Sequence, residues 1–225
     1  MKNNYLEFAE HFAARHKLVV CSFDFRHHGR SENAPPTFGE AESWDLAAFL
    51  DEADRHGSPK PYILIGESLG AMAAQRLAIS DSRISGAVLL HPPAWPWDAV
   101  GKALNSWPVV AGAGTLINLA YGRNILAAGD VRQYPAHPEH QPRLLYVMGD
   151  QDHYDWKQTR KIYDHWYSGS PATFNEWPAA KPAERKWFVL IPGAQHPDNN
   201  PDKFTLLTWP PLIPLLDEFL EIVLH

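Results

Sequence analysis

The sequence has very little cysteine and no long apolar run, and both absences exclude classes of protein. Cys21 is the single cysteine among 225 residues, so no disulfide forms within the chain and no oxidising compartment is required. No apolar stretch reaches the roughly 20 residues that a membrane-spanning helix needs. The N-terminal residues are polar and lack the apolar core of a signal peptide. We therefore expect a cytoplasmic protein without a membrane span.

Clustered positive charge is also absent. The net charge is −6 and the chain contains no run of Lys or Arg, so nucleic acid is not expected as a partner. Internal repeats and low-complexity tracts are absent as well. The apolar share of 45% is ordinary for a globular protein, and the length suits one domain with a sizeable core.

Apolar runs alternate with helical patterns along most of the chain. Continuous apolar or β-branched runs predict strands, and apolar stripes at helical spacing predict helices. Strands are expected at 17–25, 61–66, 83–93, 143–150 and 186–193. Helices are expected at 5–16, 40–57, 68–80, 155–167 and 204–224. This alternation predicts an α/β fold with a mostly parallel sheet and helices on both of its faces.

The segment 94–141 breaks the alternation, and it is rich in Trp, Pro and Ala. We interpret it as a small helical lid inserted in a single domain that spans residues 1–225. Trp95, Trp97 and Trp107 are candidates for an apolar substrate-binding wall, and the alternative is that each packs the lid onto the core. The lid has no cluster of charged residues, so an uncharged substrate is expected.

A serine stands between two glycines where a buried strand is expected to meet a helix. Residues 66–70 read Gly-Glu-Ser-Leu-Gly, the pattern of a nucleophile elbow. We expect the tight turn to hold Ser68 in a strained conformation, with Gly66 and Gly70 avoiding collisions of Cβ atoms. The backbone N–H of Leu69 would then face the oxyanion of an attacked carbonyl. The alternative is a glycine-rich turn with an incidental serine, but the flanking strand and small-residue helix favour a nucleophile.

A serine nucleophile needs a base and an acid that orients the base. Asp150 and Asp152 follow the strand expected at 143–150, and His196 follows the last strand in a loop. The order Ser, Asp, His along the chain is the order that a nucleophile-elbow fold uses. The chain contains 12 histidines, and two others near strand ends are weaker rivals for the base: His91 and His153.

The His-rich segment 134–141 raises the possibility of a metal site. His137 and His140 are three residues apart, but Pro138 breaks any helix there and no third ligand is evident. A solvated loop is the favoured interpretation. We expect neither a metal nor an organic cofactor.

Four motifs resemble those of the α/β-hydrolase superfamily, and especially its lid-bearing esterases, lipases and acylaminopeptidase-like members. They are the loop FDFRHHGRSE, the elbow GESLG, the acid turn GDQD and the histidine loop GAQH. In the first loop Asp24, Arg26, His28, Gly29 and Ser31 match the family, while His27 replaces a glycine.

The resemblance spans nearly the whole chain and implies a triad of Ser68, His196 and Asp152, because the family's acid is commonly the fourth residue of the Gly-x-x-Asp turn. It also implies hydrolysis of a small-molecule carboxylic ester through an acyl-enzyme. Short to medium acyl chains are expected, because the lid is small.

The N-terminal part departs from the family, which places three strands before the first helix. One of those strands is central in the family's sheet, and the loop after it supplies the second oxyanion donor. The chain therefore resembles an N-terminally shortened form. We expect the 17–25 strand to pair directly with the 61–66 strand, or another chain to cover the open edge, as in a homo-oligomer. We also expect weak activity. The alternative function is an inactive α/β-hydrolase-like protein that binds a small apolar ligand or a partner chain.

Overall fold

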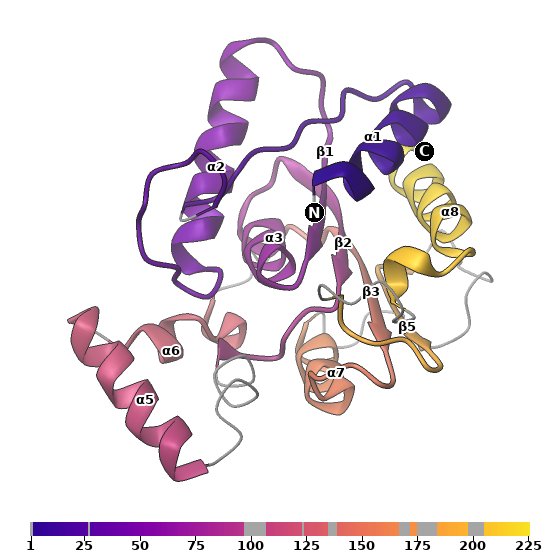
Figure 1. Ribbon diagram of the computed structural model, residues 1–225. Helices are drawn as coiled ribbons and strands as arrows, with labels where there is room; N and C mark the ends of the chain where they lie inside the picture. Colours follow the sequence, from indigo (N-terminus) through magenta and orange to yellow (C-terminus); the bar gives the residue numbers. More distant parts are fainter. Residues whose placement is uncertain are drawn as a thin grey trace.

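A computed structural model describes residues 2–26, 28–96, 107–122, 124–134, 139–166, 172–174, 184–197 and 205–225. Five strands form one parallel sheet in the order β1-β2-β3-β5-β4 (Figure 1). The strands are β1 (Tyr62–Glu67), β2 (Ile84–Leu90), β3 (Arg143–Gly149), β4 (Ala172–Phe174) and β5 (Lys186–Ile191). The predicted α/β fold with a parallel sheet is confirmed, and the short edge strand β4 is an addition to it.

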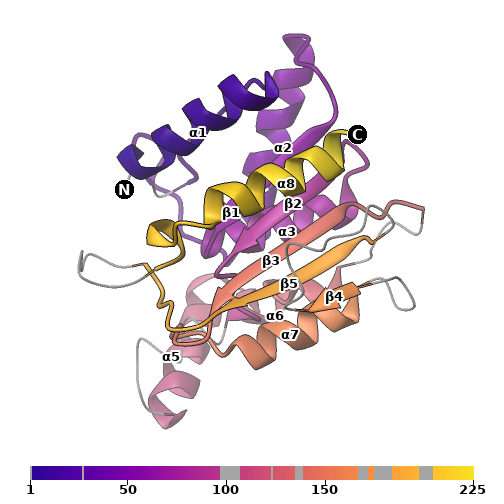
Figure 2. The ribbon, with the colours of Figure 1, turned by 90° about the vertical axis from the view of Figure 1, so that its right-hand side faces the viewer.

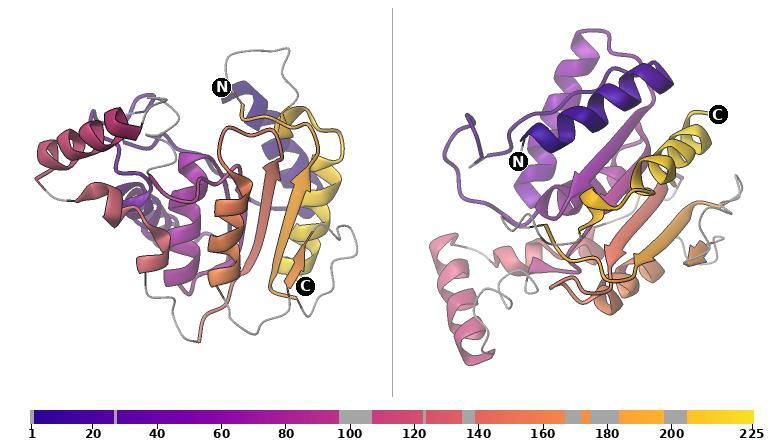
Figure 3. Two further views of the ribbon diagram at one scale, coloured as in Figure 1. Left: turned by 90° about the horizontal axis from the view of Figure 1, so that it is seen from below. Right: turned by 45° about the vertical axis from the view of Figure 1, so that its right-hand side comes forward.

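Helices cover both faces of the sheet (Figure 3). On one face lie α1 (Lys2–His16) and α8 (Leu212–Leu224), which share a buried cluster with β2, β3 and β5. On the other face lie α2 (Glu40–Arg55), α3 (Leu69–Ser80) and α7 (Trp156–His165). The small residues of α3, such as Ala71 and Ala78, are fully buried, and small side chains let this helix lie close to the sheet.

The prediction of a buried strand at 17–25 is wrong. This segment has no strand structure and pairs with no strand, and Val19 and Val20 are 70% and 43% exposed. A groove of about 430 Å³ lies between this segment and β1, so neither backbone reaches the other's hydrogen-bonding groups. The β-branched side chains favour a pleated and half-buried surface, and they have no neighbouring strand to provide one.

The loop that follows this segment is built around Asp24. Its Oδ2 accepts the N–H of Arg30 at 3.1 Å, and its backbone carbonyl accepts the hydroxyl of Ser31. Gly29 is required in this loop, since its φ is 55° and a Cβ there would collide with the Asp24 carboxylate. Arg26 forms a bidentate pair with Asp45 on α2, at 2.6 and 2.8 Å. This motif therefore has a structural role, which is to fasten the loop to α2. His27 lies outside the described residues.

The described part of the expected lid contains α5 (Trp107–Ala120), α6 (Ile125–Ala128) and the 3-10 turn η1 (Val131–Gln133). Figures 1 and 2 show α5 extending away from the sheet and its helices. Ile117 and Tyr121 pack against buried Ile125 and Leu126 of α6. No helix within the described ranges is long and apolar enough to cross a membrane.

Candidate active site

Ser68 occupies the turn between β1 and α3, where it precedes the first residue of the helix. Its φ of 52° and ψ of −115° are unusual for a residue with a side chain. The turn is held to the sheet by the backbone, because the N–H of Ser68 donates to the carbonyl of Leu90 at 2.9 Å. Leu69 follows as the first residue of α3, and the first N–H groups of a helix have no acceptor within it. The turn therefore has the form expected of a nucleophile elbow.

The two glycines of the elbow differ in importance. A Cβ on Gly66 would collide with the backbone of Gly70 and lie 2.8 Å from the nitrogen of Ala71, so this position requires glycine. A Cβ on Gly70 would make only an ordinary contact with Phe25, at 3.8 Å. The expectation that Gly70 avoids such a collision is therefore wrong, because the close approach is made at Gly66.

Asp152 and His196 meet at the carboxyl end of the sheet. Asp152 follows β3, His196 follows β5, and the two strands are neighbours. The Nδ1 of His196 lies 3.2 Å from Oδ2 of Asp152. The Asp152 side chain is fully buried, and its Oδ1 accepts the N–H of Tyr154 at 2.7 Å. Burial by itself raises the pKa of the Asp152 carboxyl group. Hydrogen bonds from His196 and His91 outweigh this effect, so the pKa lies well below its ordinary value.

Asp150 is used differently. Its Oδ1 accepts the N–H of Gly193 at 2.6 Å, and its own N–H donates to the carbonyl of Ile191 at 3.1 Å. These bonds join the loop after β3 to the turn after β5. Of the two aspartates in this loop, Asp152 is the one bonded to His196.

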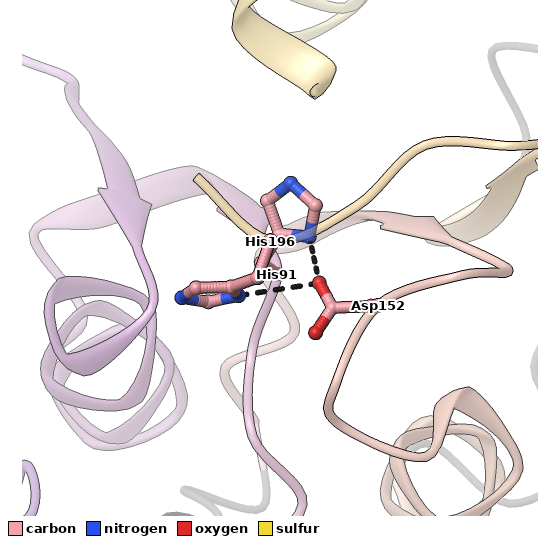
Figure 4. A group of neighbouring side chains, drawn as sticks. All are labelled: His91, Asp152 and His196. Atoms are coloured by element: carbon pink, nitrogen blue, oxygen red, sulfur yellow. Dashed lines mark hydrogen bonds and ion pairs between the residues drawn. The ribbon is translucent and has the colours of Figure 1, made fainter. Parts of the chain in front are cut away.

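His91 is a member of this group that sequence reasoning placed only among the rival bases. It follows β2 directly, and its Nδ1 contacts the same Oδ2 of Asp152 (Figure 4). Its position just after a buried strand, at the carboxyl edge of the sheet, was the signal in the sequence. The ring of His153 packs on that of His196, with 4.1 Å between the ring centroids.

The structure does not join all the residues of the expected triad. Within the described part of the chain, no hydrogen bond connects the hydroxyl of Ser68 to His196. The elbow lies next to the strand end that carries His91. Glu67 pairs with Leu90 of β2, and the N–H of Ser68 bonds to the carbonyl of Leu90. Catalytic hydrogen bonds are often long in enzymes without substrate.

Glu67 places a second carboxyl group beside the site. The hydroxyl of Tyr5 on α1 donates to its Oε2, while Oε1 is buried with no hydrogen-bond partner among the described residues. Burial raises the pKa of Glu67 to about 7; the charge of His196 opposes this shift, and that of Asp152 adds to it. The first helix therefore contacts the residue that precedes Ser68.

Two of the three tryptophans expected at the substrate lie outside what the structure describes. Trp97 is outside the described residues, and for Trp107 only the backbone, at the start of α5, is described. Trp95 packs against the core, and the guanidinium carbon of Arg132 lies 4.5 Å from the centre of its ring. These contacts match the packing alternative for Trp95.

The histidines that could ligate a metal ion have other contacts in the structure. The Nε2 of His140 lies 3.1 Å from the carbonyl of Ala78, which is a structural contact, and His137 lies outside the described residues. Among the described residues one group could hold a metal ion: the ligand atoms of His91, Asp152 and His196 lie within 4.8 Å of one another. The hydrogen bonds between these three side chains already account for their arrangement.

A parallel sheet covered by helices on both faces, with a strained serine on a strand-to-helix turn, defines the α/β-hydrolase class of fold. A family comparison matches residues 4–206 to the "Alpha/beta hydrolase family". The chain belongs to this family. A comparison with curated proteins gives no match.

Solved structures share the fold at low sequence identity. An esterase of Pyrococcus furiosus superposes with a TM-score of 0.60 and 20% identity, over 86% of this chain and 68% of the esterase. A monoacylglycerol lipase of Paleococcus ferrophilus gives a TM-score of 0.54 and 14% identity, over 91% of this chain and 82% of the lipase. Identities at this level establish the common fold alone.

Proposed function

We propose that the protein is a serine hydrolase that cleaves uncharged carboxylic esters, with Ser68 as nucleophile, His196 as base and Asp152 as the acid that orients His196. The observation that carries this proposal is the conformation of Ser68, a non-glycine residue at a φ of 52° between a parallel strand and a helix. Strained backbone of this kind persists only where the surrounding structure holds it, and it is concentrated at functional sites.

In the proposed first half-reaction, Oγ of Ser68 attacks the ester carbonyl carbon while Nε2 of His196 takes the hydroxyl proton. His196 is suited to this role because its Nδ1 is directed at Asp152, which leaves Nε2 as the acceptor. The oxyanion of the tetrahedral intermediate accepts the N–H of Leu69. The bond to the alcohol oxygen then breaks, the alcohol leaves with the proton from His196, and the acyl group stays on Ser68.

In the second half-reaction, a water molecule gives its proton to His196 and attacks the acyl-enzyme. The carboxylic acid leaves, and the proton returns to the oxygen of Ser68. Asp152 remains ionised throughout and stabilises the imidazolium of His196. The buried carboxylate with its lowered pKa is suited to this role.

A second candidate function is a catalytically weak or inactive member of the family that binds a small apolar ligand or a partner chain. It is favoured by the missing hydrogen bond between Ser68 and His196 within the described residues, and by the apolar groove beside β1. The two candidates differ in whether Ser68 is activated.

Labelling with a fluorophosphonate distinguishes the two, because this reagent reacts with an activated serine whatever the natural substrate is. We expect one label per chain on the wild-type protein, none on Ser68→Ala, and unchanged labelling of Ser80→Ala. Ser80 is the matched control because it lies at the far end of the same helix, where its hydroxyl bonds to the carbonyl of Arg76. Absence of label on the folded wild-type protein would support the second candidate.

A further inference from the structure

Asp152 holds two imidazoles on one oxygen atom. Figure 4 shows His91 and His196 each directing Nδ1 at Oδ2 of Asp152. The two rings lie edge to face, with 5.1 Å between their centroids. His91 is the more deeply placed of the two, because its side chain is 0% exposed against 12% for His196. A triad mechanism uses only one of these imidazoles.

The hydrogen-bonding partners define the protonation of His91. An ionised carboxylate only accepts, so Nδ1 of His91 carries the proton and donates to Asp152. The Nε2 of His91 is buried and has no partner among the described residues. Burial lowers the pKa of His91, and this outweighs the opposite effect of Asp152, so the ring is neutral. His91 therefore donates a hydrogen bond to Asp152 without cancelling its charge.

Among the described residues, the other ionisable groups around His91 and Asp152 come from three neighbouring segments. His196 follows β5, Glu67 ends β1, and His153 follows Asp152 in the loop after β3. The carboxylate of Asp152 bonds to His91, and the side chains of these two residues are fully buried. The backbone of His91 has a φ of 49°, and its N–H donates to the carbonyl of Val147 on β3 at 2.9 Å. The backbone hydrogen bond to Val147 and the side-chain bond to Asp152 together fix the position of the ring.

From this geometry we infer that His91 is a positioning residue for the proposed triad: its Nδ1–H fixes the Asp152 carboxylate and takes up part of its charge, which sets the basicity of His196. This inference rests on the proposed function. Two donors on Oδ2 and a third on Oδ1 leave the carboxylate little freedom to rotate. Asp152 in turn orients His196, so the effect of His91 reaches the reacting base through the carboxylate.

Removal of the His91 donor has a defined electrostatic consequence. Without that hydrogen bond the charge of Asp152 acts more fully on His196 and stabilises its imidazolium form more strongly. The acidic limb of the pH profile of kcat/KM reports this group in the free enzyme and moves to higher pH. Looser orientation also lowers kcat, by about 10- to 100-fold, which is the order expected for a lost hydrogen bond to a charged group.

The test compares His91→Ala, which removes the donor, with His91→Asn, whose side-chain amide can donate from nearly the same place. Asn also tolerates the left-handed backbone of this position. We expect the Ala variant to show the upward shift of the acidic limb and the loss of kcat. The Asn variant should have the acidic limb of the wild-type protein and a kcat within about threefold of the wild-type value. His140→Ala is the control for loss of a histidine, since His140 contacts the carbonyl of Ala78 about 15 Å along α3 from Ser68.

NMR titration of the His196 ring in the same three variants gives a readout that does not need turnover. A folded His91→Ala protein with a wild-type titration of His196 would overturn the inference. So would equal losses in the Ala and Asn variants with an unmoved acidic limb, because His91 would then serve packing alone. If the wild-type protein takes no fluorophosphonate label, the proposed function fails, and the NMR titration still decides the role of His91.

Discussion

Asp152 is the residue on which the proposed chemistry depends most, because its carboxylate contacts both imidazoles of the site. The sequence offered Asp150 and Asp152 with similar positions after the same strand, and the family resemblance favoured Asp152. The structure gives the two residues different partners. Asp152 bonds to His196 and His91, whereas Asp150 bonds to the backbone of Gly193.

We expect Asp152→Asn to lower ester turnover by about 10⁴-fold, as in the protease precedent, because an amide has one accepting oxygen where the carboxylate uses two for three N–H groups, and an NH2 group facing His196 would favour its wrong tautomer. Asp150→Asn should have a much smaller effect, since its amide oxygen can still accept the N–H of Gly193. Steady-state kinetics on both variants, with thermal unfolding to confirm their folds, makes the comparison. The reverse ranking would contradict the assignment of the acid.

Glu67 gives a prediction about pH and stability. Its pKa is about 7 in the folded protein and about 4.5 in the unfolded chain, so between these values the folded state binds more protons. The free energy of unfolding should therefore fall as the pH rises through this window, by at most about 3 kcal/mol. Glu67→Gln keeps the shape and removes the ionisation, so it should become the more stable protein above pH 7.

Urea unfolding at pH 5 and pH 8 measures this difference. Glu10→Gln is the matched control, because Glu10 is an exposed glutamate on α1. We expect the stability of the control to follow that of the wild-type protein at both values. A difference between wild type and Glu67→Gln that does not grow with pH would mean that the Glu67 carboxyl stays in one protonation state.

At the scale of elements, the sequence predicted best where local pattern and tertiary burial agree. The runs that became β1, β2, β3 and β5 are apolar and pair with strands on at least one side, and each was expected within a few residues of its bounds. The run at 17–25 has an equally β-like composition but no partner strand, so it stays irregular. Composition describes the side chains of a strand, whereas a strand also needs a neighbour for its backbone.

The same limit applies to the site. The order of Ser68, Asp152 and His196 along the chain follows from motif and element order, and the structure brings Asp152 and His196 together. The bond from His91 could not be read from the pattern, because it depends on how the ends of β2 and β3 meet in three dimensions. Tertiary contacts between loops that follow different strands leave little trace in one sequence.

The segment that includes α5 and α6 leads to a prediction about substrate. Residues Trp107–Ala120 contain no charged side chain, and Leu116 and Leu119 are 68% and 71% exposed. A lid segment without charged side chains offers a charged acyl group no ion pair, so uncharged esters are the expected substrates, and the small lid favours short to medium acyl chains. We expect p-nitrophenyl acetate, butyrate and octanoate to be cleaved faster than the palmitate. The hemisuccinate, which resembles the butyrate but carries a charge, should be a poor substrate. A preference for the hemisuccinate or the palmitate would contradict the proposed substrate class.

At the scale of the whole molecule, the sheet ends at the strand that leads to Ser68. β1 is an edge strand and pairs only with β2 among the described strands. The N–H groups of Tyr62 and Ser68 donate to Arg83 and Leu90, so the alternate residues Ile63 and Ile65 direct their N–H groups to the outer edge. Ile65 is 44% exposed, and the groove along this edge is lined largely by apolar side chains. The edge is therefore open to an additional strand.

We predict that the chain associates with itself through this edge, because the unpaired edge of β1 beside exposed Val19 and Val20 favours strand addition. A charged side chain on an edge strand opposes such pairing, so Ile65→Lys should shift the protein towards the monomer. Light scattering coupled to size-exclusion chromatography, over a range of protein concentrations, measures the change.

Leu119→Lys is the matched variant, because it places the same charge on the other exposed apolar surface, the helix α5. If Leu119→Lys dissociates the protein and Ile65→Lys does not, the helix is the interface. If the wild-type chain is monomeric at every concentration, the open edge of β1 does not drive association.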